Sequence, residues 1–224
     1  MKIRLSYGKK QIDFAYDPTQ FEVIGKETLI KPLTDREIGD KLDNSDWENF
    51  ESQINLDETV LIVVPDATRK IGCGQIVNII VRRLIANGTM PYEINIIFAT
   101  GIHRAPTDEE KQQILTPFIA QRIKTFSHDA RDLMQLTRLG SLEDGTPIEL
   151  NKRLTEYDHV IIIGGINFHY FAGFTGGRKL ICPGLASSRT IAATHKLAFD
   201  FETKDRRAGV KVGKLDGNPV HKAF

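Results

Sequence analysis

The 224-residue sequence has few cysteines, one tryptophan and almost no excess of charge of either sign. Its two cysteines, Cys73 and Cys182, form neither a disulfide framework nor a C-x-x-C metal site, and we expect both to be small buried apolar residues. The formal net charge of +1 argues against a surface built to bind nucleic acid or an anionic membrane.

Long apolar runs are absent as well. No stretch approaches the roughly 18 residues needed to span a bilayer, and the chain does not open on a secretory signal. The content of 41% hydrophobic and 26% charged residues is typical of a globular protein with a sizeable core. We therefore expect a cytoplasmic protein with no membrane or nucleic-acid partner.

Strand and helix patterns alternate regularly in the middle of the chain. Residues 59–64, 94–98 and 160–163 are short apolar runs typical of strands buried on both faces of a parallel sheet. A helical pattern over residues 76–84 follows the first run. The sequence therefore predicts an α/β fold with a doubly wound, mostly parallel sheet and helices on both faces.

Weaker patterns complete the outline. Residues 3–16 alternate around Gly8, which predicts a small N-terminal β-hairpin, and Asp144-Gly145 predicts another. Residues 35–49 have a faint helical pattern.

Two further helices are expected. Thr107 and Glu110 form a capping box that predicts a helix to about residue 121, interrupted at Pro117. Another helix is expected over residues 188–198.

Polar side chains follow three of the expected strands. In chain order they are Asp66, Arg69, Thr100, His103, His169 and Lys179. Ligands of open parallel sheets bind beyond the carboxyl ends of the strands, so we expect these side chains to lie close together at that edge.

Six of the 18 glycines lie between residues 164 and 184, where backbone must turn tightly or approach a ligand. The segment resembles a phosphate-binding loop but fails that pattern, because Arg178 replaces its last glycine and Leu180 its hydroxyl residue. Gly72-Cys73-Gly74 begins a dinucleotide fingerprint, but Val77 takes the place of the third glycine.

Three of the six histidines, His103, His169 and His195, lie where a ligand could reach them. They do not have the spacing of a zinc site. The other three, which we expect to be surface or capping residues, are His128, His159 and His221.

Three motifs together carry a family resemblance: Asp66-Ala-Thr-Arg69, Ala99-Thr-Gly-Ile-His103-Arg104, and Gly164-Gly-Ile-Asn-Phe-His169 with Ala172-Gly-Phe-Thr-Gly-Gly-Arg-Lys179-Leu-Ile-Cys-Pro-Gly-Leu185 and His195. They resemble the lactate racemase family over roughly residues 60–224. The resemblance implies an isomerase that racemises or epimerises 2-hydroxy acids with a nickel-pincer nucleotide (nickel pyridinium-3,5-bisthiocarboxylic acid mononucleotide).

The resemblance also implies a role for each matching residue. Lys179 resembles the lysine that holds the cofactor covalently through a thioamide, and His195 the single protein ligand to nickel. The cofactor's two sulfurs and one carbon supply the other ligands, and both imidazole and sulfur donors suit nickel. Asp66 is grouped with the cofactor-binding residues in a supporting role.

His103 and His169 resemble the acid/base pair that serves the two faces of the substrate, and Arg69 resembles a residue that binds the substrate carboxylate. Histidine suits proton transfer because its pKa lies near working pH. Proteins that build the cofactor are implied as partners.

Family members are longer, with a second domain that adds a substrate-binding lysine. Asn218-Pro219 predicts a helix start, and the sequence stops five residues after Pro219. We therefore expect residues 1–200 to be an N-terminal cofactor-binding catalytic domain and residues 201–224 to begin a connection to an absent C-terminal domain.

Two other functions stay open at this point. One is a doubly wound transferase that binds a phosphate group or nucleotide through the glycine-rich segment. The other is a domain that binds such a ligand without catalysis.

Overall fold

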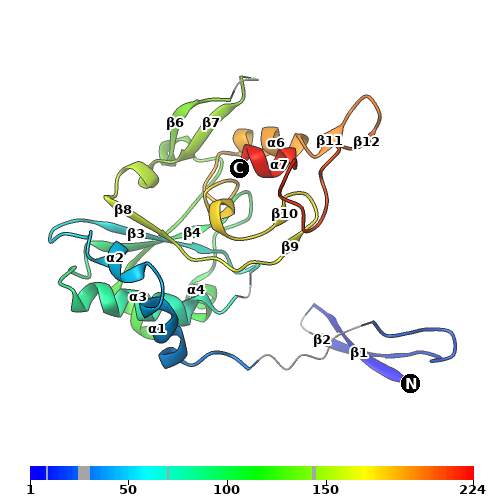
Figure 1. Cartoon of the computed structure of the whole chain (residues 1–224), viewed down its shortest axis with the longest axis horizontal. Helices are drawn as coiled ribbons and strands as arrows, with labels where there is room; N and C mark the ends of the chain where they lie inside the picture. Colours follow the sequence, from blue (N-terminus) through cyan, green and yellow to red (C-terminus); the bar gives the residue numbers. More distant parts are fainter. Residues whose placement is uncertain (9, 25–30, 70, 143–144) are drawn as a thin grey trace. The chain divides into compact units, whose positions relative to one another are not determined.

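We describe the chain from a computed structural model, in residues 1–8, 10–24, 31–69, 71–142 and 145–224. The chain divides into two compact units, Met1–Leu33 and Thr34–Phe224. The first contains an antiparallel hairpin of β1 (Lys2–Tyr7) and β2 (Lys10–Ala15), labelled in Figure 1. The predicted N-terminal hairpin is therefore confirmed.

The second unit is built on a four-stranded parallel sheet in the order β5-β4-β3-β8. From one edge of the sheet to the other, the strands are β5 (Lys124–Ser127), β4 (Ile94–Ala99), β3 (Val60–Pro65) and β8 (His159–Ile162). All six residues of β3 are buried, as expected of a central strand covered on both faces.

α-Helices cover one face of this sheet, where α1, α2, α3 and α4 lie on the same side in Figure 1. Their bounds, with that of α5, are α1 (Asp35–Asp43), α2 (Trp47–Glu51), α3 (Cys73–Ala86), α4 (Asp108–Ile114) and α5 (Pro117–Arg122). The apolar side of α3 packs Val77, Val81 and Leu84 against alternate residues of β3 and β4.

Local sequence determines where these helices begin and end. Thr107 and Glu110 form the predicted capping box at α4, and Pro117 starts α5 as a separate helix. The faint helical pattern of residues 35–49 becomes two helices, because the chain turns after Asp43 before α2 begins. Among the described residues, no helix is both long and apolar enough to cross a membrane.

Short helices and loops cover the other face. On this face, β3 presents Leu61 and Val63. They pack against Leu154 of η2 (Lys152–Thr155), Tyr157 just after it, and Leu180 of η3 (Gly177–Leu180). The hairpin of β6 (Leu136–Ser141) and β7 (Pro147–Asn151), α6 (Ser188–Lys196) and α7 (Pro219–Ala223) lie on this side in Figure 1. The predicted doubly wound α/β class is confirmed.

The remaining elements are short. They are η1 (Leu133–Gln135), the paired strands β9 (Phe168–His169) and β10 (Gly173–Phe174), and the pair β11 (Phe199–Asp200) and β12 (Asp205–Arg206). The predicted Asp144-Gly145 turn lies between β6 and β7; Asp144 is outside the described residues, and Gly145 has a φ of 82°. Asn218 caps α7 as predicted, with its side chain accepting from the amides of Val220 and His221.

Candidate active site

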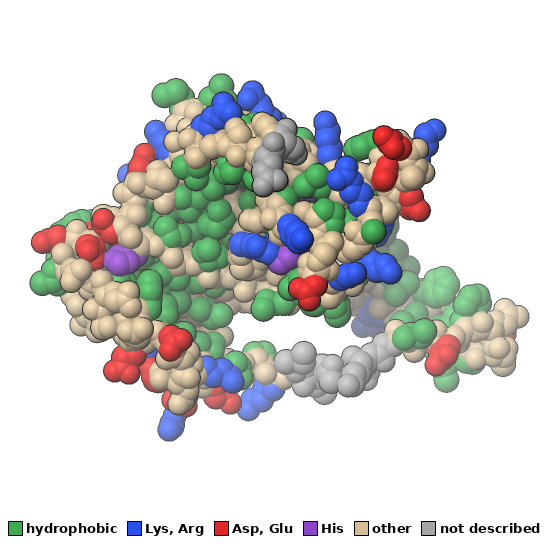
Figure 2. Space-filling model, turned by 45° about the horizontal axis from the view of Figure 1, so that its top comes forward, with side chains coloured by type: hydrophobic (Ala, Val, Ile, Leu, Met, Phe, Trp, Pro, Cys, Tyr) green, Lys and Arg blue, Asp and Glu red, His purple; other side chains and the backbone are tan. Residues whose placement is uncertain are grey.

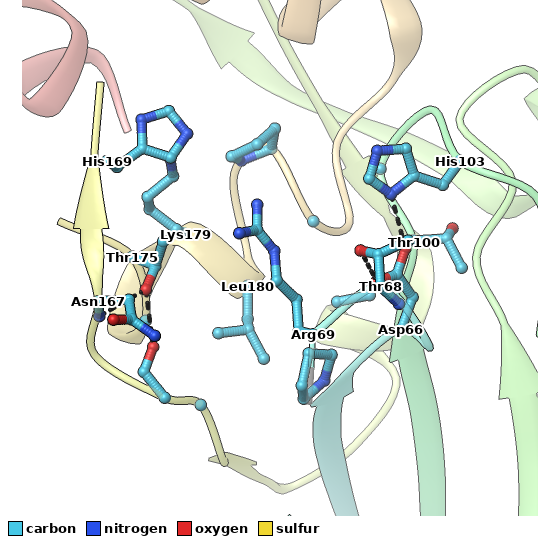
Figure 3. Close-up of a pocket in the computed structure, with 18 of the residues that line it drawn as sticks. Asp66, Thr68, Arg69, Thr100, His103, Asn167, His169, Thr175, Lys179 and Leu180 are labelled. Carbon is cyan, nitrogen blue, oxygen red and sulfur yellow. Dashed lines mark hydrogen bonds and ion pairs between the residues drawn. The ribbon is translucent and has the colours of Figure 1, made fainter. Parts of the chain in front are cut away.

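A cavity of about 490 Å³ lies beyond the carboxyl ends of β3, β4 and β8. The predicted residues that line it are Asp66, Arg69, Thr100, His103, His169, Lys179 and His195. In Figure 3, His169 and Lys179 lie on one side, His103 and Asp66 on the other, and Arg69 points into the space between them. The structure thus brings the six residues predicted at this edge of the sheet to one cleft, together with His195.

Asp66 links the loop after β3 to the loop after β4. It follows β3 directly, is buried, and its Oδ2 lies 2.6 Å from Nδ1 of His103. Its Oδ1 accepts hydrogen bonds from the backbone amide and the hydroxyl of Thr68, at 3.1 and 2.6 Å. This Asx turn holds the carboxylate in place while Oδ2 contacts the half-exposed imidazole.

The loop after β4 is anchored by a buried polar network. Thr100 donates its hydroxyl hydrogen to the carbonyl oxygen of His128 at 2.6 Å, and the His128 ring contacts Asn151 and the carbonyl of Ala186. His128 is 1% exposed, so its assignment as a surface or capping residue is wrong. Burial lowers the pKa of His128, which keeps the ring neutral within the network.

The other two histidines expected to be surface or capping residues, His159 and His221, each contact another side chain. Nε2 of His159 is 2.7 Å from a carboxylate oxygen of Glu58. Nε2 of His221, in α7, contacts a guanidinium nitrogen of Arg178. Neither histidine lines the cleft.

The glycine-rich segment packs closely against the sheet and against itself. A Cβ at Gly164 would lie 2.6 Å from Cδ1 of Leu180, and a Cβ at Gly184 would lie 2.9 Å from Cβ of Ala99. The amide of Gly101 donates to the carbonyl of Gly184 at 2.8 Å, joining this segment to the loop after β4. A Cβ at Gly184 would also overlap the carbonyl oxygen of Leu180, so this position requires glycine, whereas a side chain at Gly164 would displace the Leu180 side chain.

Lys179 is held within η3 and its amine lies in the cleft. Burial, and then the positive charge of Arg69, lower the pKa of Lys179 to about 8. The Lys179 ammonium also lies 5.1 Å from the centre of the Phe224 ring. Because its pKa is below the usual range, a larger share of the amine is neutral and nucleophilic near pH 8 than for an exposed lysine.

His169 is buried on the same side of the cleft. Its Nδ1 accepts from the backbone amides of Phe171 and Ala172, both at 3.1 Å, and its ring stacks on Tyr170 at a centroid distance of 4.7 Å. Burial, followed by the charges of Lys179, Arg69 and His195, lowers the pKa of His169 to about 4. The ring is therefore neutral at pH 7.

His195 comes from α6, whose start is fixed by Ser187 as N-cap and by a hydrogen bond from that hydroxyl to Glu149 of β7 at 2.7 Å. Nδ1 of His195 lies 2.8 Å from the carbonyl oxygen of Ile191. Burial, with the charge of Lys179 adding to it, lowers the pKa of His195. A neutral ring with Nδ1 donating leaves Nε2 with a lone pair, which is the form that binds metals.

The cleft collects positive charge. Figure 2 shows Lys and Arg side chains beside a histidine in the middle of one face. Arg69 is exposed, and no ion pair within the described residues joins its side chain to a carboxylate. A free guanidinium at a cleft suits the bidentate binding of a carboxylate or phosphate.

Sequence reasoning missed some residues of the cleft. The cleft is also lined by Asn167, Tyr170 and Thr175. The Thr175 hydroxyl connects two parts of the glycine-rich segment, because it accepts from the amide of Asn167 and donates to the carbonyl of Gly165, both at 2.8 Å. Thr68 could have been recognised, because Asp-x-Thr is a common Asx-turn sequence.

Within the described part of the chain, the side chains alone do not form a metal site. Among the described residues, no group of three or more histidines, cysteines, aspartates or glutamates is placed to hold a metal ion. A metal bound at His195 would need its other ligands from a bound molecule.

Comparison with known proteins identifies what the chain resembles. A family model described as the lactate racemase N-terminal domain matches residues 7–207. A lactate racemase from Lactiplantibacillus plantarum is 32% identical over 225 residues, covering 98% of this chain and 52% of the relative. A lactate racemase from Thermoanaerobacterium thermosaccharolyticum is 27% identical over 232 residues, with 98% and 51% covered.

Solved structures agree with this assignment. The lactate racemase apoprotein from Thermoanaerobacterium thermosaccharolyticum superposes with a TM-score of 0.78 at 25% identity, covering 100% of this chain and 52% of that chain. A protein from Thermotoga maritima gives a TM-score of 0.71 at 26% identity, with 86% and 46% covered. The chain spans about half the length of the curated relatives it matches.

Removing the charge of Lys179 should raise the pKa of His169. We expect Lys179→Met to move the His169 midpoint from about 4 part of the way toward its ordinary 6.5, because burial and Arg69 continue to lower it. Histidine ring NMR as a function of pH measures the midpoint. Lys196→Met, which removes an exposed lysine from α6, is the control and should leave it unchanged. The same midpoint in Lys179→Met and the parent chain would contradict the electrostatic coupling.

Proposed function

The chain belongs to the family of the lactate racemase N-terminal domain, and on that premise we propose that its cleft serves the racemisation of lactate or a related 2-hydroxy acid. The observation that carries the proposal is the convergence of Arg69, His103, His169, Lys179 and His195 on one cleft. These are the residues to which the motifs assign carboxylate binding, proton transfer and cofactor attachment.

We propose that the cleft holds a nickel-pincer nucleotide. Lys179 would attach it through Nζ, and the lowered pKa of that amine fits a residue that must react as a nucleophile. His195 would bind nickel through Nε2, which is left unprotonated in the neutral ring by the contact of Nδ1 with Ile191. The cavity of about 490 Å³ lies within the range usual for cofactor sites, roughly 300–1,000 Å³.

When bound, the nucleotide supplies a hydride acceptor and donor for C2 of the substrate. The protein's part is to orient the substrate and to move the proton of its hydroxyl group. Arg69 binds the carboxylate, which places C2 in the space between His103 and His169. His103 and His169 serve as the acid/base pair on the two sides of that space.

The alternative of a phosphate-binding transferase has weaker support. Leu180 packs against β3 and offers no hydroxyl to a magnesium ion, and no observation of the described residues favours a bound triphosphate over the proposed nucleotide.

Attachment of the cofactor tests the proposal. The chain is co-expressed with the proteins that build the nucleotide, which we propose as its partners in the cell. Lys179→Ala should abolish the covalent mass increase measured by intact-protein mass spectrometry. His195→Ala should keep the mass increase but retain much less nickel, measured by metal analysis.

Lys196→Ala is the matched control and should behave as the parent chain. An unchanged adduct in Lys179→Ala would refute attachment at this residue. Full nickel retention in His195→Ala would refute its role as ligand while leaving the attachment site intact.

Substrate binding by Arg69 and hydride transfer are tested in one assay. The loaded chain is incubated with D-lactate in ²H₂O beside the longer Lactiplantibacillus plantarum relative. We expect L-lactate that retains hydrogen at C2, because hydride does not exchange with solvent. Arg69→Ala should lower kcat/KM by about 10- to 100-fold, the value of one charge-assisted hydrogen bond, and Arg69→Lys by less. Deuterium at C2 of the product would show that C2 loses a proton instead.

A further inference from the structure

The three cleft histidines differ in what contacts Nδ1. His103 faces the carboxylate of Asp66, His195 faces the carbonyl oxygen of Ile191, and His169 faces two backbone amides. These contacts range from 2.6 to 3.1 Å, within hydrogen-bonding distance.

Each contact permits one neutral tautomer. A carboxylate and a carbonyl oxygen only accept, so in the neutral rings of His103 and His195 Nδ1 carries the proton and Nε2 is bare. Backbone amides only donate, so Nδ1 of His169 must be bare and its Nε2 must carry the proton. His103 and His169 therefore present opposite groups, a lone pair and an N–H.

We infer that Asp66 is a positioning residue that fixes His103 as the proton acceptor of the cleft, while the backbone after His169 fixes that ring as a hydrogen-bond donor. The inference rests on the proposed function for the reaction, and on the contacts alone for the tautomers. It makes the two histidines of the acid/base pair inequivalent before substrate binds.

The surroundings of Asp66 suit this role. The residue is 4% exposed, and its Oδ1 is occupied by Thr68, so the carboxylate cannot rotate without losing two hydrogen bonds. The His103 side chain is 51% exposed, and Asp66 is its one hydrogen-bonding side-chain partner among the described residues. The orientation of the ring therefore depends on Asp66.

The surroundings of His169 oppose a second proton. Protonation of Nδ1 would break two amide hydrogen bonds in a buried site that already faces Lys179, Arg69 and His195. His169 is thus suited to donate its Nε2 hydrogen to a substrate oxygen, and it must release the amides of Phe171 and Ala172 before it can take up a proton.

The proton balance follows. As the substrate O–H bond breaks, the proton forms an N–H bond at Nε2 of His103, and the nucleotide named in the proposed function would accept the hydride from C2. The resulting imidazolium is paired with the Asp66 carboxylate. The enantiomer whose hydroxyl faces His103 can react from this resting state directly. The other enantiomer requires His169 to expose an unprotonated ring nitrogen first.

Asp66→Asn tests the inference because it should invert the tautomer of His103. The amide of Thr68 can only donate, so the new asparagine keeps its oxygen toward Thr68 and turns its NH₂ group toward Nδ1 of His103. Long-range ¹H–¹⁵N NMR of the cofactor-free chain, labelled at histidine, reports which ring nitrogen carries hydrogen. We expect Nδ1–H in the parent and Nε2–H in Asp66→Asn, with Nε2–H at His169 in both.

Thr68→Ala is the matched control, since it removes one hydrogen bond to Oδ1 but leaves Oδ2 on His103; the tautomer should stay Nδ1–H. Nε2–H at His103 in the parent, or an unchanged tautomer in Asp66→Asn, would overturn the inference. The parent spectrum tests the expected tautomers of His103 and His169 even if Asp66→Asn fails to fold.

In the loaded enzyme, Asp66→Asn should lower kcat by about 10²- to 10⁴-fold, the usual contribution of a general base, with little change in KM. The NMR result does not depend on cofactor, so it separates the two proposals. Correct tautomers without an adduct at Lys179 would overturn the proposed function alone, and an adduct with the wrong tautomers would overturn this inference alone.

Discussion

The close backbone contact between the glycine-rich segment and the carboxyl end of the sheet is the constraint on which the cleft depends. The amide of Gly101 bonds to the carbonyl of Gly184, and the lack of a side chain at Gly164 and Gly184 allows Leu180 to pack against β3. This packing brings Lys179 to the loops that carry Asp66 and His103. If the glycine-rich segment lay farther from the sheet, the same side chains would not line one shared cavity.

The second feature of the site is the crowding of cationic and imidazole groups in a partly buried space. Arg69 and Lys179 lower the pKa of His169, and Lys179 lowers that of His195, each in addition to burial. Neutral imidazoles are the forms needed for metal binding and for hydrogen bonding to substrate. Attachment of a cofactor through Lys179 as a thioamide would also remove one of these charges, so we expect cofactor loading and the protonation of His169 to be linked.

The sequence predicted three of the four strands of the sheet, the capping box of α4 and the cleft residues, because these depend on local patterns and on one topological rule. Parallel strands end at the same edge, which was enough to bring together Asp66, His103 and Lys179. It did not predict that His128 is buried, because that depends on Asn151 and Ala186, which come from distant parts of the chain. The split of residues 35–49 into two helices and the tautomers of the histidines likewise depend on contacts that spacing does not encode.

Nickel-edge X-ray absorption of the cofactor-loaded chain tests the central claim most directly, because it reports the ligands of the metal in the cleft. We expect one imidazole nitrogen together with sulfur ligands, and loss of the imidazole contribution in His195→Ala. Nickel bound by several imidazoles, or a spectrum unchanged by His195→Ala, would contradict it.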